Sequence, residues 1–209
     1  MNRTPLAGLQ HVRHLGVAAS VVLALLVTVG IGYQLVTPVQ VVIGREPRFV
    51  GAAELVAAVV GALVPAIAAP TFDQRERLAV GRVRFANTLV SLLLTLSPVL
   101  VLVTWYAVVR AFAEQLVPVP AAFVGNFLLI GIIGLAGTLL AGRRLGPVLS
   151  FTACFAVVAV QQAWPDAWLS TALSTSTKWT TTWWLIGPAL VLVLALDFRL
   201  GSCPRGIDD

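Results

Sequence analysis

The side chains that most often carry chemistry in proteins are scarce in this sequence. Its two histidines, His11 and His14, lie close together near the N-terminus; of its two cysteines, Cys154 lies in an apolar run and Cys203 near the C-terminus. A haem held between facing helices needs ligands on two elements, and a zinc protease needs His-Glu-x-x-His or a similar spacing. Neither pattern occurs in the sequence. We therefore expect no metal site, no cofactor and no disulfide in this chain.

Nucleotide or peptide hydrolysis by this chain alone is not expected either. The phosphate-binding loop Gly-x-x-x-x-Gly-Lys-Ser/Thr is absent, and the single lysine is Lys178. A protease that works within the bilayer would need a Ser with a His at depth, or two Asp. Only Asp197 lies close to an apolar run, at its end. The sequence therefore predicts a protein without catalytic residues, not an enzyme.

Two polar residues inside apolar runs remain as candidates for a binding site. Glu54 lies about one turn into its run, where a carboxylate is costly in lipid. It either faces a protein interior or water, or it extends to the membrane surface and pairs with Arg45 or Arg48. Asn126 lies in a later run, and such an amide serves either as a substrate ligand or, more commonly, as an interhelical hydrogen-bonding group.

The composition requires a membrane to position these residues. Hydrophobic residues make up 58% of the chain and charged residues 11%, whereas soluble domains are about 25% charged. The net charge is +5, but the basic residues lie in short segments between apolar runs, as in most membrane proteins. Nucleic acid is therefore not an expected partner, and the lipid bilayer is.

The apolar runs predict an all-α, polytopic transmembrane helix bundle with six spans. A helical span needs about 20 apolar residues. Residues 1–15 are expected to form a cytoplasmic surface segment, 16–200 the six-helix transmembrane domain and 201–209 a cytoplasmic tail. The six predicted spans are Gly16–Val36, Gly51–Ala69, Leu89–Val109, Ala121–Ala141, Gly146–Gln162 and Thr182–Leu196.

The distribution of basic residues orients this bundle. With six spans, one side carries ten Arg and the other carries three Arg and the Lys. Because Lys and Arg are enriched in cytoplasmic loops, both termini are expected in the cytoplasm of a multi-pass protein of the inner (plasma) membrane. All six Trp fall at the predicted outer ends, where their amphipathic rings favour the headgroup level: Trp105, Trp164, Trp168, Trp179, Trp183 and Trp184.

Three segments outside the spans have distinctive compositions. Asn2–Leu15 mixes apolar and basic residues and predicts either an amphipathic surface helix or a short tail. Thr71–Gly81 fits a short cytoplasmic helix, with Thr71 and Gln74 forming a capping box. Ala163–Thr181 is rich in Trp, Ser and Thr and predicts either a re-entrant or surface element or an ordinary outer loop.

The segment after the second span is the candidate docking site for a cytoplasmic partner. It presents alternating charges beside two apolar side chains, in the residues Phe72, Asp73, Arg75, Glu76, Arg77 and Leu78. A partner protein can read such a combination of shape and charge sign. The alternative is a solvated basic connector that serves only to orient the chain.

The order of these segments resembles the membrane subunit of an ABC-2-type exporter. Such permeases have a cytoplasmic surface helix, six spans with both termini inside, a coupling loop between spans two and three, and an outer element between spans five and six. Asn2–Leu15, Thr71–Val80 and Ala163–Thr181 occupy these three positions. The resemblance covers nearly the whole chain and rests on topology, not on a sequence motif.

The resemblance implies a transport function. A separate ABC-type ATPase subunit would bind the segment 73–84, and a second permease subunit, identical or related, would complete the pathway. The exported substrate would be amphipathic or lipid-like, such as a drug or an antimicrobial peptide. The alternative is an ATP-independent accessory, immunity or structural subunit of a larger membrane complex.

Overall fold

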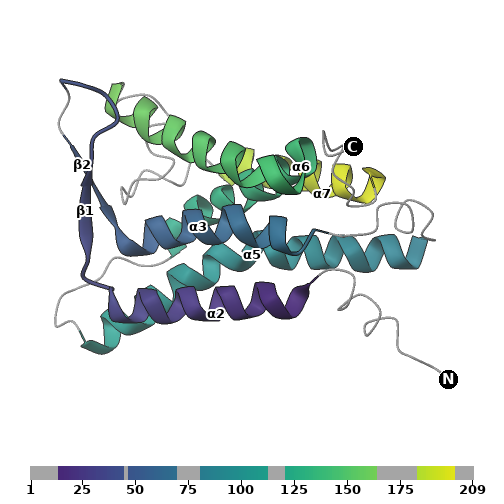
Figure 1. Cartoon of the computed structure of the whole chain (residues 1–209), viewed down its shortest axis with the longest axis horizontal. Coiled ribbons are helices and arrows are strands. Elements are labelled where there is room, and N and C mark those ends of the chain that lie inside the picture. The colour runs from purple at the N-terminus through teal and green to yellow at the C-terminus, as the bar shows by residue number, and fades with distance from the viewer. Residues whose placement is uncertain (1–13, 45–46, 70–80, 113–120, 164–182, 201–209) are drawn as a thin grey trace.

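The computed structural model describes residues 14–44, 47–69, 81–112, 121–163 and 183–200. These residues are mainly helical, which confirms the all-α class (Figure 1). The elements are the helices α2 (Leu15–Ile31), α3 (Ala52–Ile67), α5 (Gly81–Phe112), α6 (Ala121–Ala163) and α7 (Trp183–Leu200), and the strands β1 (Val36–Val39) and β2 (Arg48–Gly51).

Helix α6 is two helical arms joined at a sharp bend. Gly142 has φ 81° and ψ 177°, a conformation that interrupts the helix and that only glycine adopts readily. The arms fold back on each other, so that the Ser150 hydroxyl lies 3.5 Å from the carbonyl oxygen of Ile133, and Gly146 packs on the backbone of Thr138. The two spans predicted over Ala121–Ala141 and Gly146–Gln162 are thus the arms of one helical hairpin.

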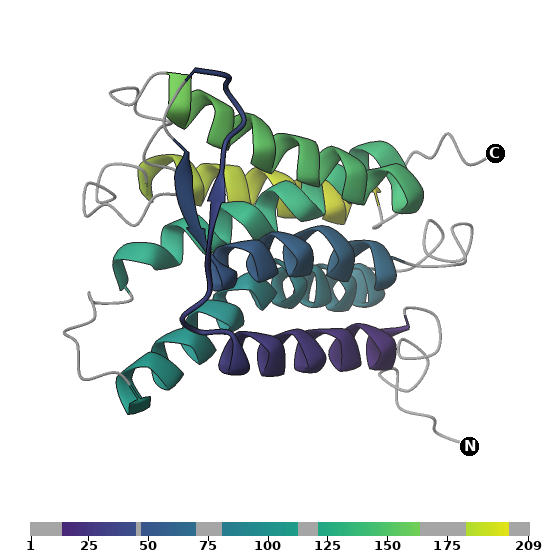
Figure 2. The same cartoon turned by 60° about the vertical axis from the view of Figure 1, so that its left-hand side comes forward.

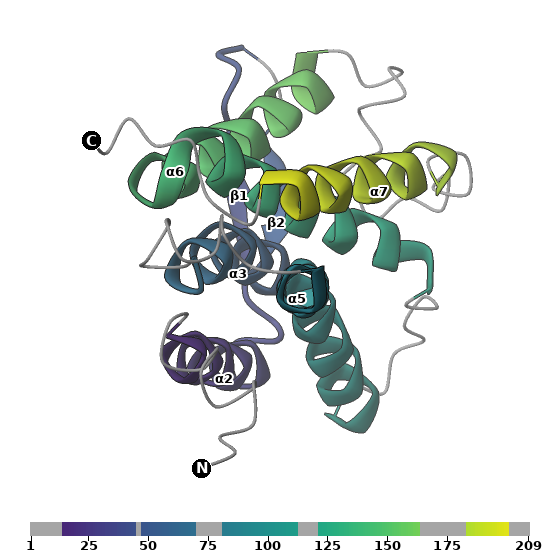
Figure 3. The same ribbon diagram turned by 90° about the vertical axis from the view of Figure 1, so that its right-hand side faces the viewer.

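Helices α2 and α3 run along the long axis of the molecule, whereas α7 and the second half of α5 are inclined to it (Figures 1 and 3). The helix ends define two ends of the bundle. At one end lie the β-strands, with the start of α3 and the end of α2. The opposite end, which we call the basic end, holds the start of α5, the bend of α6 and the end of α7. Connections between successive elements therefore alternate between the two ends, as in an up-and-down bundle.

Strands β1 and β2 form a short antiparallel hairpin, called the ribbon here, across one end of the bundle (Figure 2). Val36 pairs with Gly51 and Val39 with Arg48, and the Ala52 amide donates to the Leu35 carbonyl oxygen at 2.9 Å. The ribbon was not predicted. The expected first span, Gly16–Val36, is wrong at its C-terminal end, because α2 stops at Ile31 and Val36 hydrogen-bonds within a strand instead.

Helix α5 bends at a proline whose missing hydrogen bond is replaced locally. Pro98 has no N–H to donate to the Leu94 carbonyl. The hydroxyl of Ser97 donates to that oxygen at 2.6 Å. The change of direction within α5 is visible in Figure 3. The segment before the bend, around Thr95, and the segment after it, around Trp105, therefore take different paths through the bundle.

Three helices cross at glycines near the middle of the bundle. A side chain on Gly134 would collide with the carbonyl of Gly61 in α3, and one on Gly131 with the carbonyl of Thr95 in α5. Pro65 cannot donate a hydrogen bond to the Gly61 carbonyl, which is therefore available to the Cα–H of Gly134. Small residues at a crossing let backbones approach closely, which is the usual packing of membrane helices.

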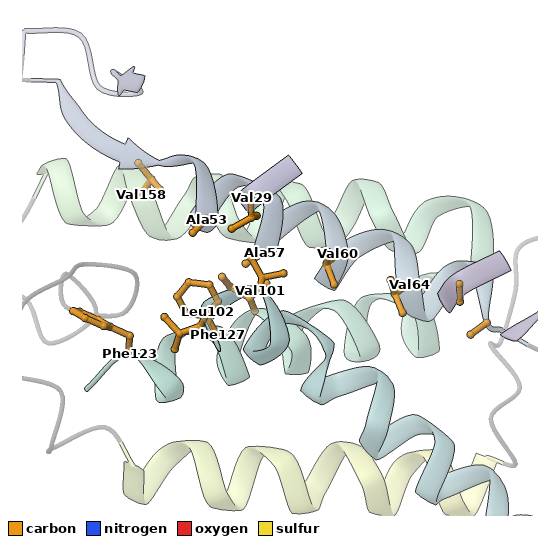
Figure 4. Close-up of a cluster of buried hydrophobic side chains, with 13 residues drawn as sticks. Val29, Ala53, Ala57, Val60, Val64, Val101, Leu102, Phe123, Phe127 and Val158 are labelled. Carbon is orange, nitrogen blue, oxygen red and sulfur yellow. The ribbon is translucent and has the colours of Figure 1, made fainter. Parts of the chain in front are cut away.

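Aliphatic side chains extend this crossing into a core between α2, α3, α5 and α6 (Figure 4). Val29, Val60 and Val101 are fully buried there. Many large apolar side chains point outward instead, including Leu93 at 66% exposure and Val191 at 67%. An apolar exterior of this extent is unfavourable in water and suits a lipid environment.

Among the described residues, two helices are long and apolar enough to cross a membrane, over Arg84–Phe112 and Phe123–Val160. The second contains the bend at Gly142. Helices α2 and α3, of 17 and 16 residues, are apolar but shorter. The third predicted span, Leu89–Val109, lies within the longer α5, and the sixth, Thr182–Leu196, corresponds to α7.

Candidate functional site

A cavity of about 230 Å³ lies between the ribbon and helices α3, α5 and α6. It is the larger of two neighbouring cavities and is mostly apolar. We call it the ribbon cavity, and its lining residues are Tyr33, Leu35, Val36, Phe49, Gly51, Ala53, Glu54, Leu102, Trp105, Phe123, Asn126, Phe127 and Ile130. Residues from five elements (β1, β2, α3, α5 and α6) and from the turn after α2 thus converge on one space.

The ribbon cavity contains both polar residues that the sequence singled out. Glu54, in the first turn of α3, and Asn126, in the first arm of α6, both line it. Asn126 is 3% exposed and Glu54 is half-buried. Glu54 therefore borders the ribbon cavity, and both of its predicted placements stay predictions. Arg45 lies outside the described residues, as does the side chain of Arg48, so the pairing alternative stays a prediction.

An indole hydrogen bond fixes one wall of the ribbon cavity. The Nε1–H of Trp105 donates to the carbonyl oxygen of Tyr33 at 3.2 Å. This bond ties α5 to the turn that leaves α2, and it satisfies the polar edge of a ring whose remaining surface is apolar. Trp105 was predicted at an outer helix end for its interfacial preference. In the structure it also lines the ribbon cavity.

A second cavity of about 170 Å³ lies on the other side of Glu54. It shares Glu54 and Ile130 with the ribbon cavity, so these two side chains form a common wall. Its other lining residues include Leu55, Phe151 and Cys154. Cys154 is a buried free thiol. The described lining of this cavity offers one carboxylate in otherwise apolar surroundings.

Gln162 holds the ribbon in place over the two cavities. Its side-chain NH₂ donates to the Val39 carbonyl oxygen at 2.7 Å, and its side-chain oxygen accepts from the amides of Val41 and Val42, each at 2.9 Å. One amide side chain therefore satisfies three backbone groups at the end of β1. The sequence gives no local signal for this role, because Gln162 and Val39 are 123 positions apart.

A line of buried polar residues follows one face of α5 before its bend. Asn87, Ser91 and Thr95 recur at intervals of four and are each at most 2% exposed. The Thr95 hydroxyl donates to the Ser91 carbonyl oxygen at 2.8 Å. Neither side-chain polar atom of Asn87 has a hydrogen-bond partner within the described residues. Thr95 also lies at the crossing with α6, where a side chain on Gly131 would collide with its carbonyl oxygen.

The predicted docking residues Phe72, Asp73, Arg75, Glu76, Arg77 and Leu78 lie outside the described residues, so the structure does not place them. The segments Asn2–Leu15 and Ala163–Thr181 are likewise outside, apart from their last residues and first residue, respectively. Within the described ranges, no group of three or more His, Cys, Asp or Glu residues could hold a metal ion.

Comparisons with known proteins add no family assignment. No protein-family model matches the sequence, and no curated protein and no solved structure resembles the chain at a significant level. What the ribbon cavity can do must therefore be argued from its own residues. Its described lining offers an aromatic-rich space with a carboxylate and an amide, which suits binding of a small molecule.

Proposed function

We propose that this chain is a multi-pass protein of the inner membrane, with six spans and both termini in the cytoplasm, that serves as the permease subunit of an ABC-type exporter. A separate ATPase subunit supplies the energy, and a second permease subunit completes the pathway. The exported molecule is amphipathic. The two arms of α6, together with α2, α3, α5 and α7, are the six proposed spans.

The polarity of the bundle is the observation that carries this proposal. Cavities lie at the ribbon end, whereas most described arginines belong to the basic end: Arg82 and Arg84 at the start of α5, Arg143 and Arg144 after the bend of α6, and Arg199 in the last turn of α7. Only Arg48 and Arg110 among the described arginines belong to the ribbon end. By the positive-inside rule, the basic end faces the cytoplasm and the cavities open outward.

The same polarity puts the candidate docking segment where a cytoplasmic ATPase could reach it. Helix α3 ends and α5 begins at the basic end. The residues that connect them include Phe72–Leu78, which the resemblance to ABC-2-type permeases assigns to coupling. Helices α3 and α5 both line the ribbon cavity. A force applied to their connection would therefore act on two walls of the cavity.

A charge-swapped variant tests the coupling role. Glu76→Arg combined with Arg77→Glu conserves net charge, so membrane insertion should be unchanged. We expect it to abolish co-purification of the ATPase in mild detergent and to remove export-linked resistance. The matched control is Arg205→Asp with Asp208→Arg, the same swap in the C-terminal tail. Normal ATPase binding by the first variant would reduce the segment to a solvated connector.

Site-directed labelling tests the six-span topology. Single cysteines at positions 51, 121 and 177, in a background lacking Cys154 and Cys203, should react with a membrane-impermeant maleimide from outside. A cysteine at position 74 should react only after the membrane is opened. Reaction at position 177 from the cytoplasmic side alone would contradict six spans.

A further inference from the structure

We propose that the second cavity binds part of an acyl chain of a membrane phospholipid, which enters sideways from the outer half of the bilayer. This inference goes beyond the exporter function. It rests on the proposed function only for the placement of α3 and α6 across the membrane, with the ribbon on the outer side. Binding itself requires nothing but this protein and a lipid.

The second cavity lies between α3 and the second arm of α6. Leu55, Ala58 and Val59 line it from one face of α3, at intervals of three and four residues. Phe151 and Phe155, about one turn apart, line it from the arm. The two helices diverge towards the ribbon (Figures 1 and 2). Their facing apolar surfaces are therefore separated by a space next to the ribbon.

The entrance to this cavity lies on the side of the bundle. Leu55 is 41% exposed and Phe155 is 53% exposed, although both line the cavity. They belong to the two helices that flank it, whereas Val39 and Val50 line it from the ribbon. Access is therefore between α3 and the second arm of α6, where the lateral surface of a membrane-spanning bundle meets acyl chains.

The chemistry of the lining selects an apolar occupant. Glu54, on the wall shared with the ribbon cavity, already interacts with another group of the protein. Apart from Glu54 and the thiol of Cys154, the lining side chains are aliphatic or aromatic. A buried water needs several polar partners, and a cavity lined by such apolar side chains stays dry and binds apolar molecules. In a bilayer, the apolar molecule at the entrance is an acyl chain.

The volume of the cavity indicates that only part of a molecule enters it. Sites that enclose a whole ligand typically measure about 300 to 1,000 Å³, whereas the second cavity has a volume of about 170 Å³. A slender, flexible acyl chain can insert one portion and leave the rest, with the headgroup, in the bilayer. A rigid fused-ring molecule cannot divide itself in this way.

The native thiol of Cys154 reports on occupancy, because it lines the cavity. The full-length Cys203→Ser variant is purified in digitonin and treated with methyl methanethiosulfonate, a small membrane-permeant reagent, and labelling is followed by mass spectrometry. Dodecylphosphocholine, which has a linear chain, should slow labelling saturably, by about tenfold at ten times its half-protecting concentration. CHAPS, which is also zwitterionic but has a rigid steroid body, should leave the rate unchanged.

A control thiol separates occupancy of the cavity from general coating by detergent. Ala24→Cys, in a background that lacks both native cysteines, places a thiol on the exposed surface of α2. Its labelling rate should respond in the same way to both detergents.

A variant that fills the cavity tests the site by a second measurement. Ala58→Phe adds a ring to the lining of the cavity. Native mass spectrometry of protein from nanodiscs of phosphatidylethanolamine and phosphatidylglycerol should show a retained phospholipid on the original protein and its loss in Ala58→Phe. Ala24→Phe adds the same ring on the exposed surface of α2 and is the matched control, which should retain the lipid.

Several outcomes would overturn the inference. Equal slowing by dodecylphosphocholine and CHAPS, or slowing by neither, would show that the cavity does not select a linear chain. A Cys154 thiol that fails to react in digitonin would mean that small molecules do not reach the cavity. Equal lipid retention by Ala58→Phe and the original protein would place the lipid elsewhere, and retention of a free fatty acid alone would reject a phospholipid as the occupant.

The same measurements distinguish this inference from the proposed function. Protection of Cys154 by dodecylphosphocholine without any co-purifying ATPase would keep the acyl-chain site and reject the exporter. An ATPase partner without protection of Cys154 would do the reverse.

Discussion

Helices α3 and α6 are in backbone contact at one point and separated by cavities at another, about two turns away. At Gly61 and Gly134 a single side-chain carbon could not fit between them. Near Glu54 and Asn126 the same two helices line an open space. The contrast follows from residue size. Glycines let the backbones of α3 and α6 touch at the crossing, whereas larger side chains keep the two backbones apart near the ribbon.

Helix α5 shows the same contrast on either side of Pro98. Before the bend, the backbone of Thr95 touches α6 at Gly131. After the bend, Leu102 and Trp105 line the ribbon cavity. A straight α5 could not both contact Gly131 and line the ribbon cavity. The bend at Pro98 redirects the second half of the helix and so allows both contacts. The closed crossing thus fixes the bundle, and the bend leaves room for a site.

The largest effect is expected where the crossing is tightest. Gly134→Ala would place a carbon against the carbonyl oxygen of Gly61, a backbone atom that cannot rotate away. The helices must separate, and we expect a loss of about 3 kcal/mol in the free energy of unfolding. Thermal unfolding in detergent measures this. Gly187→Ala in α7, which meets no atom within 4 Å, is the matched control and should be neutral or slightly stabilising.

A smaller loss is expected at the wall of the cavity. Leu102 is 1% exposed and lines the ribbon cavity. Leu102→Ala should destabilise by about 2 kcal/mol, the low end for such a truncation, because one side of the leucine already faces empty space. Leu93→Ala, on the exposed surface of the same helix, should cost much less in the same thermal assay. Equal losses of stability in the two variants would contradict the burial of Leu102 and the exposure of Leu93.

The ribbon should respond locally to loss of its anchor. Gln162→Ala removes three hydrogen bonds to Val39, Val41 and Val42. We expect a local loss of about 1 to 3 kcal/mol, seen as faster hydrogen exchange at the amides of Val41 and Val42 with little change at α3. Gln162→Glu keeps the acceptor for both amides and should retain most of their protection. Unchanged exchange in Gln162→Ala would show that other contacts fix the ribbon.

The smallest effect is expected at the bend between the two regions. Ser97→Ala leaves the Leu94 carbonyl without the donor that replaces the missing N–H of Pro98. We expect a loss of about 1 kcal/mol in unfolding free energy. Ser20→Ala is the control, because the hydroxyl of Ser20 bonds to Gly16 in a helix without a proline, where the backbone bond remains. If Ser97→Ala and Ser20→Ala lower the free energy of unfolding equally, the hydroxyl of Ser97 does not stabilise the bend.

Composition and apolar runs were sufficient to predict a helical protein, because the length and polarity of a run determine whether a helix can lie in lipid. They placed α3, α7 and the two arms of α6 within a few residues, whereas α5 begins at Gly81, eight residues before its predicted span. They also singled out Glu54 and Asn126, because polar residues inside apolar runs can be recognised from the sequence alone. Neither the exporter function nor the docking segment Phe72–Leu78 is tested by the structure.

Only the tertiary structure decided that Glu54 and Asn126 share a cavity. They are 72 positions apart, and their meeting depends on the crossing of α3 and α6 at Gly61 and Gly134. The ribbon was missed because its strands are four residues each and continue apolar segments, and the anchor Gln162 acts on residues more than 100 positions away. Sequence patterns record how polar each position is, whereas a site depends on which distant backbones can approach, and that is set by packing.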